Sequence, residues 1–179
     1  MQHFALTIIG RDRPGIVSQV TGILYDLGCN IADSSCSILG GQFAMILILA
    51  HPDYIDRDSF GDAFLPLEES GLSVFLRVLK PGGEIRPEIE GDFCMISVYG
   101  SDKPGIVYRV AKVLGDNQVN ITDLNTKLIG SDKSPVYVLI LEATLPENIT
   151  DEDVDQWMSP LRKELQVDIT VRTIPTAEL

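Results

Sequence analysis

The stretch GRDRPGIV, residues 10–17, decides the fold of this chain, because a near copy, GSDKPGIV, fills residues 100–107. Only Arg11 and Arg13 change between the copies, to Ser101 and Lys103. Neither copy holds an obvious nucleophile or a set of metal ligands. We therefore expect the phrase to act through the backbone that Asp-x-Pro-Gly imposes, as the turn from a strand into a helix.

The similarity extends beyond the phrase when the chain is shifted against itself by about 90 residues. Asp12, Pro14, Gly15, Ile16, Asn30 and Ile31 fall on Asp102, Pro104, Gly105, Ile106, Asn120 and Ile121. Two copies indicate a duplicated domain, each copy being large enough to fold by itself. Residues 81–92 are rich in proline, glycine and charge, so we expect module 1 at 1–80, a linker at 81–92 and module 2 at 93–179.

Each copy shows the same order of expected elements. In the first copy, apolar residues at helical spacing predict a helix over 14–27, with Asp12 or Arg13 at its N-cap and Gly28 just after its last turn. Strands are expected at 4–9, 30–39, 43–50 and 72–79, with a glycine hairpin turn at 40–41 and a second helix at 56–70. The order βαββαβ predicts an α+β fold of two ferredoxin-like modules, each an antiparallel sheet with both helices on one face.

The second copy departs from the first where its first helix ends. Gln118 stands at the position of Gly28. The helix must therefore end differently, and Asn117 is the residue expected in the left-handed conformation.

The strand–helix turn also suggests a ligand. A helix start offers unpaired N–H groups and the positive end of the helix dipole, which suit a carboxylate. Asp12 could accept hydrogen bonds from an ammonium group, so the pair of features suits a free amino acid. The alternative is that Asp-x-Pro-Gly only starts a helix, which is a common use of these residues.

DRPGIV followed by LGCNIAD, and DKPGIV followed by NQVNITD, in βαββαβ order, resemble the ACT domain, a regulatory module that binds amino acids. The resemblance covers nearly the whole chain, twice, and a stand-alone tandem of this size is similar to the glycine-cleavage-system transcriptional repressor family. It implies a ligand between two modules, held by the turn of one and by the Asn that starts the second strand of its neighbour. The ligand-binding residues that it implies are Asp12, Pro14, Gly15, Ile16, Asn30, Ile31, Asp102, Pro104, Gly105, Ile106, Asn120 and Ile121. We expect Gln118 to disturb the site that uses Asn120.

Composition and charge exclude other classes of function. The chain has 179 residues and a formal net charge of −12, which repels phosphate backbones, so we expect no direct nucleic-acid binding. The N-terminus does not resemble a secretory signal and no apolar run could span a bilayer, so we expect a cytoplasmic protein without membrane contact. Cys29, Cys36 and Cys94 have no paired spacing, and we expect Cys29 and Cys36 to pack as small apolar groups. With two histidines in the chain, we expect no metal and no cofactor.

Three functions stay open at this level. The first is a non-catalytic regulatory protein, expected to be a homodimer, that binds a small amino acid, with glycine as one candidate, and acts through a protein partner such as a transcription regulator. The second is a ligand-free protein-interaction or dimerisation module. The third, a small enzyme, is the weakest, because the familiar nucleophile–base sets and nucleotide-binding motifs are missing.

Overall fold

The computed structural model describes residues 1–53, 60, 62–80, 91–131 and 134–174. The chain divides into two compact units, Met1–Pro87 and Glu88–Leu179, which contain the expected modules 1 and 2. Residues 81–90 of the expected linker lie outside the described residues, so the bounds of the linker stay a prediction.

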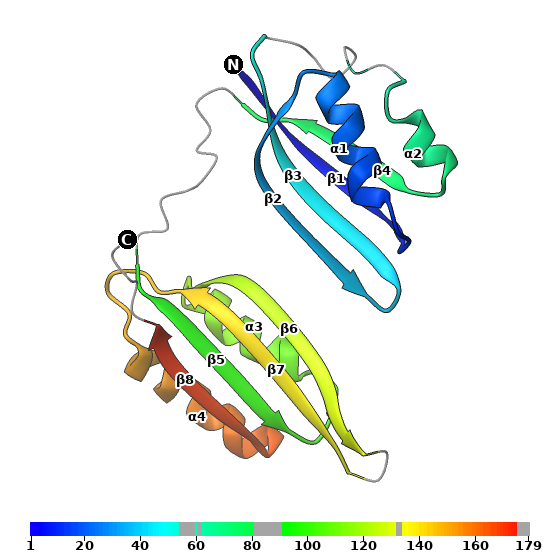
Figure 1. Cartoon of the computed structure of the whole chain (residues 1–179). Coiled ribbons are helices and arrows are strands. Elements are labelled where there is room, and N and C mark those ends of the chain that lie inside the picture. Colours follow the sequence, from blue (N-terminus) through cyan, green and yellow to red (C-terminus); the bar gives the residue numbers. More distant parts are fainter. Residues whose placement is uncertain (54–59, 61, 81–90, 132–133, 175–179) are drawn as a thin grey trace. The chain divides into compact units, whose positions relative to one another are not determined.

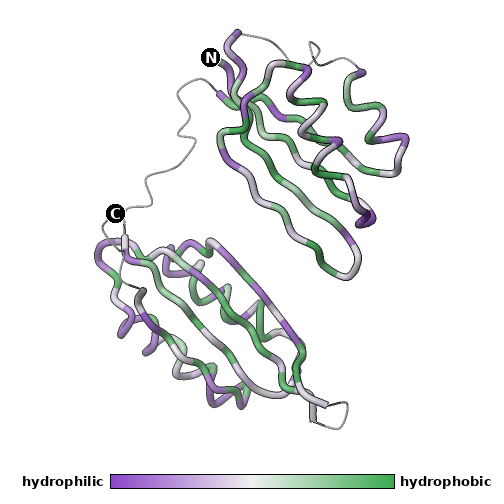
Figure 2. Tube along the Cα trace, viewed as in Figure 1, coloured by the Kyte–Doolittle hydropathy of each residue, from purple (hydrophilic) through white to green (hydrophobic). Residues whose placement is uncertain are grey.

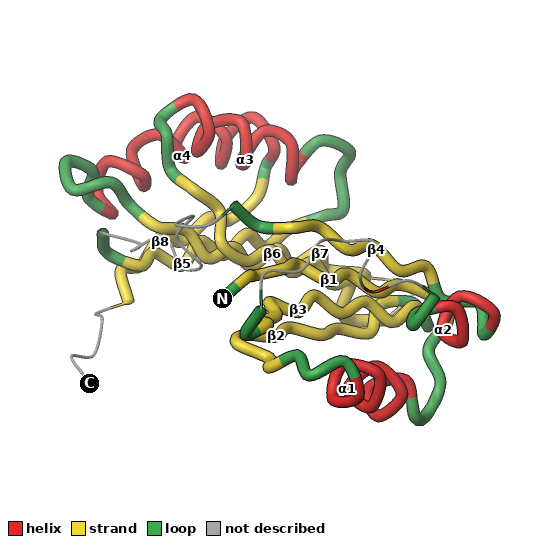
Figure 3. The backbone as a smooth tube through the Cα atoms, turned by 90° about the horizontal axis from the view of Figure 1, so that it is seen from above, coloured by secondary structure: helices red, strands yellow, loops and turns green. Residues whose placement is uncertain are grey.

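Module 1 is a four-stranded antiparallel sheet in the order β2-β3-β1-β4 (Figure 1). Its helices α1 and α2 lie on one side of the sheet (Figure 3). Its elements are β1 (Gln2–Arg11), α1 (Ile16–Asp26), β2 (Asn30–Leu39), β3 (Gln42–His51), α2 (Leu65–Glu69) and β4 (Ser73–Val78). This order confirms the expected βαββαβ module.

Module 2 repeats the arrangement, with strand order β6-β7-β5-β8 and with α3 and α4 on one face (Figures 1 and 3). Its elements are β5 (Phe93–Gly100), α3 (Ile106–Asp116), β6 (Asn120–Ser131), β7 (Ser134–Thr144), α4 (Asp151–Leu165) and β8 (Val167–Ile174). The acidic run at 151–155 starts α4, and Thr150 caps this helix in a capping box with Asp153.

Each module has its own core between sheet and helices. Alternate residues of β1 are buried, and α1 buries Ile16, Val20 and Leu24 against them. In module 2, α3 buries Ile106, Val110 and Leu114 at the same spacing. The buried residues of α1 therefore match the predicted helical spacing, and apolar residues concentrate along the central strands (Figure 2).

The helix ends correct three expectations. The first helix starts at Ile16 rather than at residue 14, and its N-cap is Gly15 rather than Asp12 or Arg13. Gly28 is left-handed, as predicted, with φ +70°. In module 2 the left-handed residue is Gln118 (φ 61°), not Asn117, whose side chain instead donates a 2.8 Å hydrogen bond to the Val113 carbonyl. Because the Asn117 side chain bonds to its own helix, the next residue, Gln118, takes the left-handed conformation that ends the helix.

The helix predicted over 56–70 differs in its described part. There the α-helix is confined to Leu65–Glu69, and residues 54–59 and 61 lie outside the described residues. The Gly40–Gly41 turn is confirmed, since both glycines have positive φ, 57° and 76°.

The N-I-x-D motif marks a β-bulge in both modules. The pairing of β2 with β3 shifts between Ile31 and Asp33, and that of β6 with β7 shifts between Ile121 and Asp123. In a regular strand, residues i and i+2 lie on the same face of the sheet. Because of the bulge, Ile31 and Asp33 lie on opposite faces.

Candidate functional site

The repeated phrase forms the same backbone turn in both modules. Gly15 has φ 91° and ψ −5°, and Gly105 has φ 94° and ψ −1°. Neither helix has a side-chain cap at its N-terminus, whereas α4 has a complete one. The left-handed glycine therefore delivers the chain into α1 and α3 with their first N–H groups free of side-chain caps.

The first glycine of the phrase is required for a different reason. A Cβ built on Gly10 would lie 2.7 Å from Leu72 Cδ2, and one on Gly100 would lie 2.7 Å from Val167 Cγ1. In each module the end of the first strand thus approaches the start of the last strand too closely for a side chain. The first glycine of the phrase therefore permits a close backbone approach.

The basic residue of the phrase ties the turn to the second helix. In module 1, Arg13 Nη2 donates to Ser70 Oγ (2.9 Å) and to Gln19 Oε1 (2.8 Å). In module 2, Lys103 Nζ donates to the Leu165 carbonyl (2.8 Å) and to Gln166 Oε1 (2.9 Å). Ser70 and Gln166 are the C-cap residues of α2 and α4. This role was not predicted. The only signal in the sequence was that both copies have a basic residue at this position, Arg13 in the first and Lys103 in the second.

A cavity of about 500 Å³ opens beside the turn of module 1. Asp12, Gly15 and the first residues of α1 line one side. The other side is formed by β2 and β3. The full lining is Asp12, Arg13, Gly15, Ile16, Val17, Ser18, Cys36, Ser37, Ile38 and Phe43. Three residues expected in the site, Asp12, Gly15 and Ile16, therefore meet in one cavity of a size suited to a small molecule.

Ile16 and Ile106 belong chiefly to the core. Their side chains are 2% and 1% exposed, so only a small part of Ile16 reaches the cavity. Pro14 and Pro104 lie in the turns themselves, next to Gly15 and Gly105. These positions are explained by the fold whether or not a ligand binds.

Asn30 and Ile31 are not brought to the cavity. Asn30 starts β2 and pairs with Ala50, whereas the cavity lies where Ile38 pairs with Phe43. A separation of eight residues along a strand is roughly 26 Å. Asn120 and Ile121 likewise start β6, at the end of that strand remote from Asp102 and Gly105. Within one module, then, the turn and the Asn cannot contact the same small ligand.

The two Asn side chains have no hydrogen-bond partner among the described residues, and both residues are exposed. Ile31 is exposed at the sheet edge, and Ile121 packs partly against the core of module 2. The carboxylates of Asp12 and Asp102 are also exposed. Each polar side chain that the resemblance implies is thus accessible to a ligand.

The cysteines divide into three environments. Burial raises the pKa of the Cys94 thiol to about 11 and also raises the pKa of Cys29. Cys36, however, is exposed and lines the cavity, so the expectation that it packs as an apolar group is wrong. Its strand β2 lies at the sheet edge, where α1 does not cover it.

The described residues contain no group of three or more His, Cys, Asp or Glu side chains that could hold a metal ion. Among the helices described, none has the length and apolar character that crossing a membrane requires.

The fold and the paired turns define a class, the tandem of ferredoxin-like modules. The ACT domain model matches residues 2–68 and 92–172, and the chain belongs to the ACT domain family. The match confirms the resemblance inferred from the repeated phrase.

Relatives extend over nearly the whole chain. The chain is 24% identical over 176 residues to the glycine cleavage system transcriptional repressor of Escherichia coli, covering 97% of this chain and 91% of the relative. A crystal structure of a protein from Galdieria sulphuraria is similar with a TM-score of 0.80 at 24% identity, covering 97% and 99% of the two chains. A structure provisionally assigned as a glycine cleavage system transcriptional repressor has a TM-score of 0.72 at 21% identity, covering 98% of each. The chain is therefore a regulatory ACT protein with the same two-module fold.

Proposed function

We propose that this protein senses a free amino acid at its strand–helix turns and passes the signal to a protein partner, without catalysis. The cavity in module 1 carries the proposal, because it joins the Asp12 carboxylate to the uncapped start of α1. A transcription regulator is the partner class suggested by the repressor relative. Glycine is the first ligand to test, for the same reason.

The chemistry of the turn suits a zwitterion. The Gln19 N–H makes the first bond of the helix, to the Gly15 carbonyl at 3.0 Å, which leaves the preceding N–H groups for a carboxylate. Asp12 lies on the same cavity and would accept hydrogen bonds from the ammonium group. The apolar part of the lining, including Ile38 and Phe43, would contact a small side chain.

Asn30 and Asn120 would have to contribute from a module other than the one whose turn binds the ligand. Their exposed side chains, without partners in the described structure, support this role. Asp102, Pro104, Gly105 and Ile106 are the corresponding turn in module 2, which keeps the same glycine conformation.

A ligand-free interaction module is the second candidate, because one observation favours it. The edge strands β2 and β6 are exposed along nearly their whole length. Unpaired edge strands are suited to pairing with another chain.

Calorimetric titration of the full chain with glycine and the other standard amino acids tests the proposal. A charge-assisted hydrogen bond contributes roughly 1.5–3 kcal/mol, so Asn30→Ala or Asp12→Asn should weaken binding about tenfold or more. A ligand at 100 times its dissociation constant should also stabilise the fold by about 2.7 kcal/mol, visible as a thermal shift.

Asp26→Asn is the matched control, because it removes the same charge as Asp12→Asn from an exposed residue at the far end of α1. It should leave binding unchanged. If no amino acid binds wild type at millimolar concentration, sensing is excluded and the interaction module is the better explanation. If Asp12→Asn and Asp26→Asn weaken binding equally, the effect is one of net charge and the turn is not the site.

A further inference from the structure

The cavity beside the turn of module 1 has a second side that is largely apolar. Asp12 and the start of α1 form the polar side, where the turn would hold the charged groups of an amino acid. Ile38 and Phe43, which pair across β2 and β3, lie on the other side. The Phe43 side chain is 4% exposed and belongs to the core, whereas Ile38 is 61% exposed. Ile38 is thus the apolar side chain that this wall offers to a ligand.

Ile38 is open to the cavity because α1 does not cover β2. The helix packs into the core of module 1 through its buried residues, while all of β2 is exposed. Cross-strand partners of an antiparallel sheet point to the same face, so Ile38 lies on the helix side of the sheet, like its buried partner Phe43. Val17, in the first turn of α1, lines the same cavity and is 44% exposed. Two apolar side chains therefore border the cavity without being covered by the module itself.

The geometry of an α-amino acid directs its side chain toward the Ile38 wall. The ammonium group, the carboxylate and the side chain are attached to the same carbon atom. If the carboxylate accepts hydrogen bonds at the start of α1 and the ammonium group donates to Asp12, both charged groups are held on one side of the cavity. The side chain then points across the cavity, toward Ile38. Glycine has no side chain and would leave this wall without contacts.

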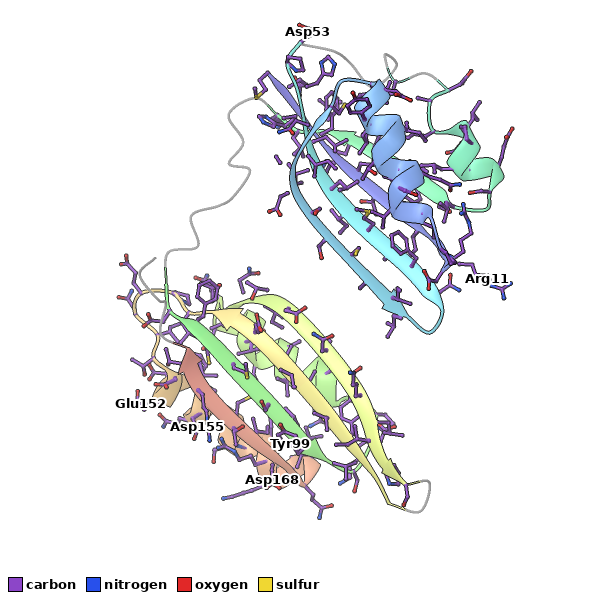
Figure 4. All side chains as sticks on the ribbon, viewed as in Figure 1. Arg11, Asp53, Tyr99, Glu152, Asp155 and Asp168 are labelled. Atoms are coloured by element: carbon purple, nitrogen blue, oxygen red, sulfur yellow. The ribbon has the colours of Figure 1, made fainter. Side chains whose placement is uncertain are left out.

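The arginines near the turn do not favour an acidic side chain on the ligand. Arg13 lines the cavity, but its Nη2 donates to Ser70 and to Gln19, neither of which is part of the lining. Arg11 does not line the cavity, and its side chain projects outward from the end of β1 (Figure 4). A charged or amide side chain of the ligand would therefore lose water at Ile38 without gaining a bond to either cation.

We infer that the cavity of module 1 selects an amino acid with an apolar side chain, of the size of valine, leucine or isoleucine, over glycine. The inference rests on the proposed function, since it requires the turn to hold the ammonium group and the carboxylate. Ile38 and Val17 set the specificity, because they contact the side chain and not the charged groups. A volume of about 500 Å³ leaves room for such a side chain beside the charged groups.

Module 2 differs at the corresponding positions. Tyr137 stands at the position of Phe43 and brings a hydroxyl group to that wall, and Tyr108 stands at the position of Ser18. The lining of the second turn is thus both more polar and bulkier. The inference is therefore confined to module 1.

Calorimetric titration of the full chain with leucine, asparagine and glycine tests the inference. Leucine and asparagine have side chains of similar shape and size, and the three ligands carry the same charged groups. Leucine should bind about tenfold or more tightly than either of the others, because only its side chain gains by leaving water at Ile38. Glycine or asparagine binding as tightly as leucine would overturn the inference and leave the proposed function standing. Binding by none of the amino acids would overturn both.

Variants of the apolar wall locate the preference. Ile38→Thr keeps a β-branched side chain and should weaken leucine binding about tenfold, with little change for asparagine. Leu39→Thr is the matched control, since Leu39 is the next residue of β2, is exposed and does not line the cavity. Circular dichroism checks folding, and Val17→Thr replaces Ile38→Thr if that variant unfolds. A preference for leucine that survives the change, or that falls equally with Leu39→Thr, would overturn the inference.

Discussion

Arg13 and Ser70, 57 positions apart, are joined by a 2.9 Å hydrogen bond that links the β1–α1 turn to the end of α2. Lys103 makes the equivalent link in module 2, to the Leu165 carbonyl and to Gln166 at the end of α4. The basic residue of the repeated phrase thus connects the strand–helix turn to the C-terminal end of the second helix in each module.

Loss of this link should destabilise each module modestly. A single hydrogen bond contributes about 1 kcal/mol, and exposed bonds contribute less. Lys103→Met should cost about 1 kcal/mol, because the bond to the Leu165 carbonyl is partly buried. Arg13→Met should cost less, because its two bonds are exposed. Urea denaturation measures both, and Lys163→Met, on the exposed surface of α4, is the control.

Gly15→Ala and Gly105→Ala should both destabilise the fold by about 1–2 kcal/mol, because a Cβ is strained at positive φ. Gly22→Ala is a matched control inside α1, where a Cβ meets nothing within 4 Å. It should stabilise by up to about 1 kcal/mol through helix propensity. Thermal unfolding compares the three. Equal effects of Gly15→Ala and Gly22→Ala would contradict the assigned role of the turn.

The α4 cap should make stability depend on pH. Hydrogen bonds from the Thr150 N–H and hydroxyl lower the pKa of Asp153. Since the folded pKa lies below the unfolded one, the stabilisation is complete above the unfolded value and is lost as pH falls through the folded value. Asp153→Asn should therefore be less stable than wild type at neutral pH, and the difference should shrink below about pH 4. Denaturant midpoints across that range measure it; a difference independent of pH would exclude the carboxylate as its source.

Limited proteolysis tests the predicted module bounds. The composition of 81–92 predicts first cleavage between Lys80 and Asp92, yielding two fragments of similar size. Mass spectrometry locates the cut. Earlier cleavage within 4–39 would contradict the division, because that range contains most of β1 and all of α1 and β2 of module 1.

The fold was predictable because the internal repeat provides two different sequences for the same order of strands and helices. The Pro-Gly start of the first helix, the helical spacing of its apolar residues and the Gly-Gly hairpin are all local signals in the sequence. The N-cap was predicted wrongly because preference tables place Asp there, whereas the Asp12 N–H is engaged by the Gly41 carbonyl at 2.9 Å. That contact fixes Asp12 outside the helix and leaves Gly15 as the last residue before it.

The candidate site was predictable only in part. Asp12 and Gly15 are four residues or fewer from the helix start, so local sequence places them together. The contributions of Cys36 and Ile38 depend on how far α1 covers the sheet, and the partners of Arg13 and Lys103 depend on the position of the second helix. Such tertiary relationships leave no periodic signal in the sequence.

The shared bulge indicates the history of the chain. Two modules that carry it at Ile31–Asp33 and at Ile121–Asp123 are most simply descended from one ancestral module that already had it. The left-handed glycine of the turn has the same origin on this view. Gln118, which takes the left-handed conformation that Gly28 takes in module 1, is then a substitution made after the duplication that kept the backbone turn.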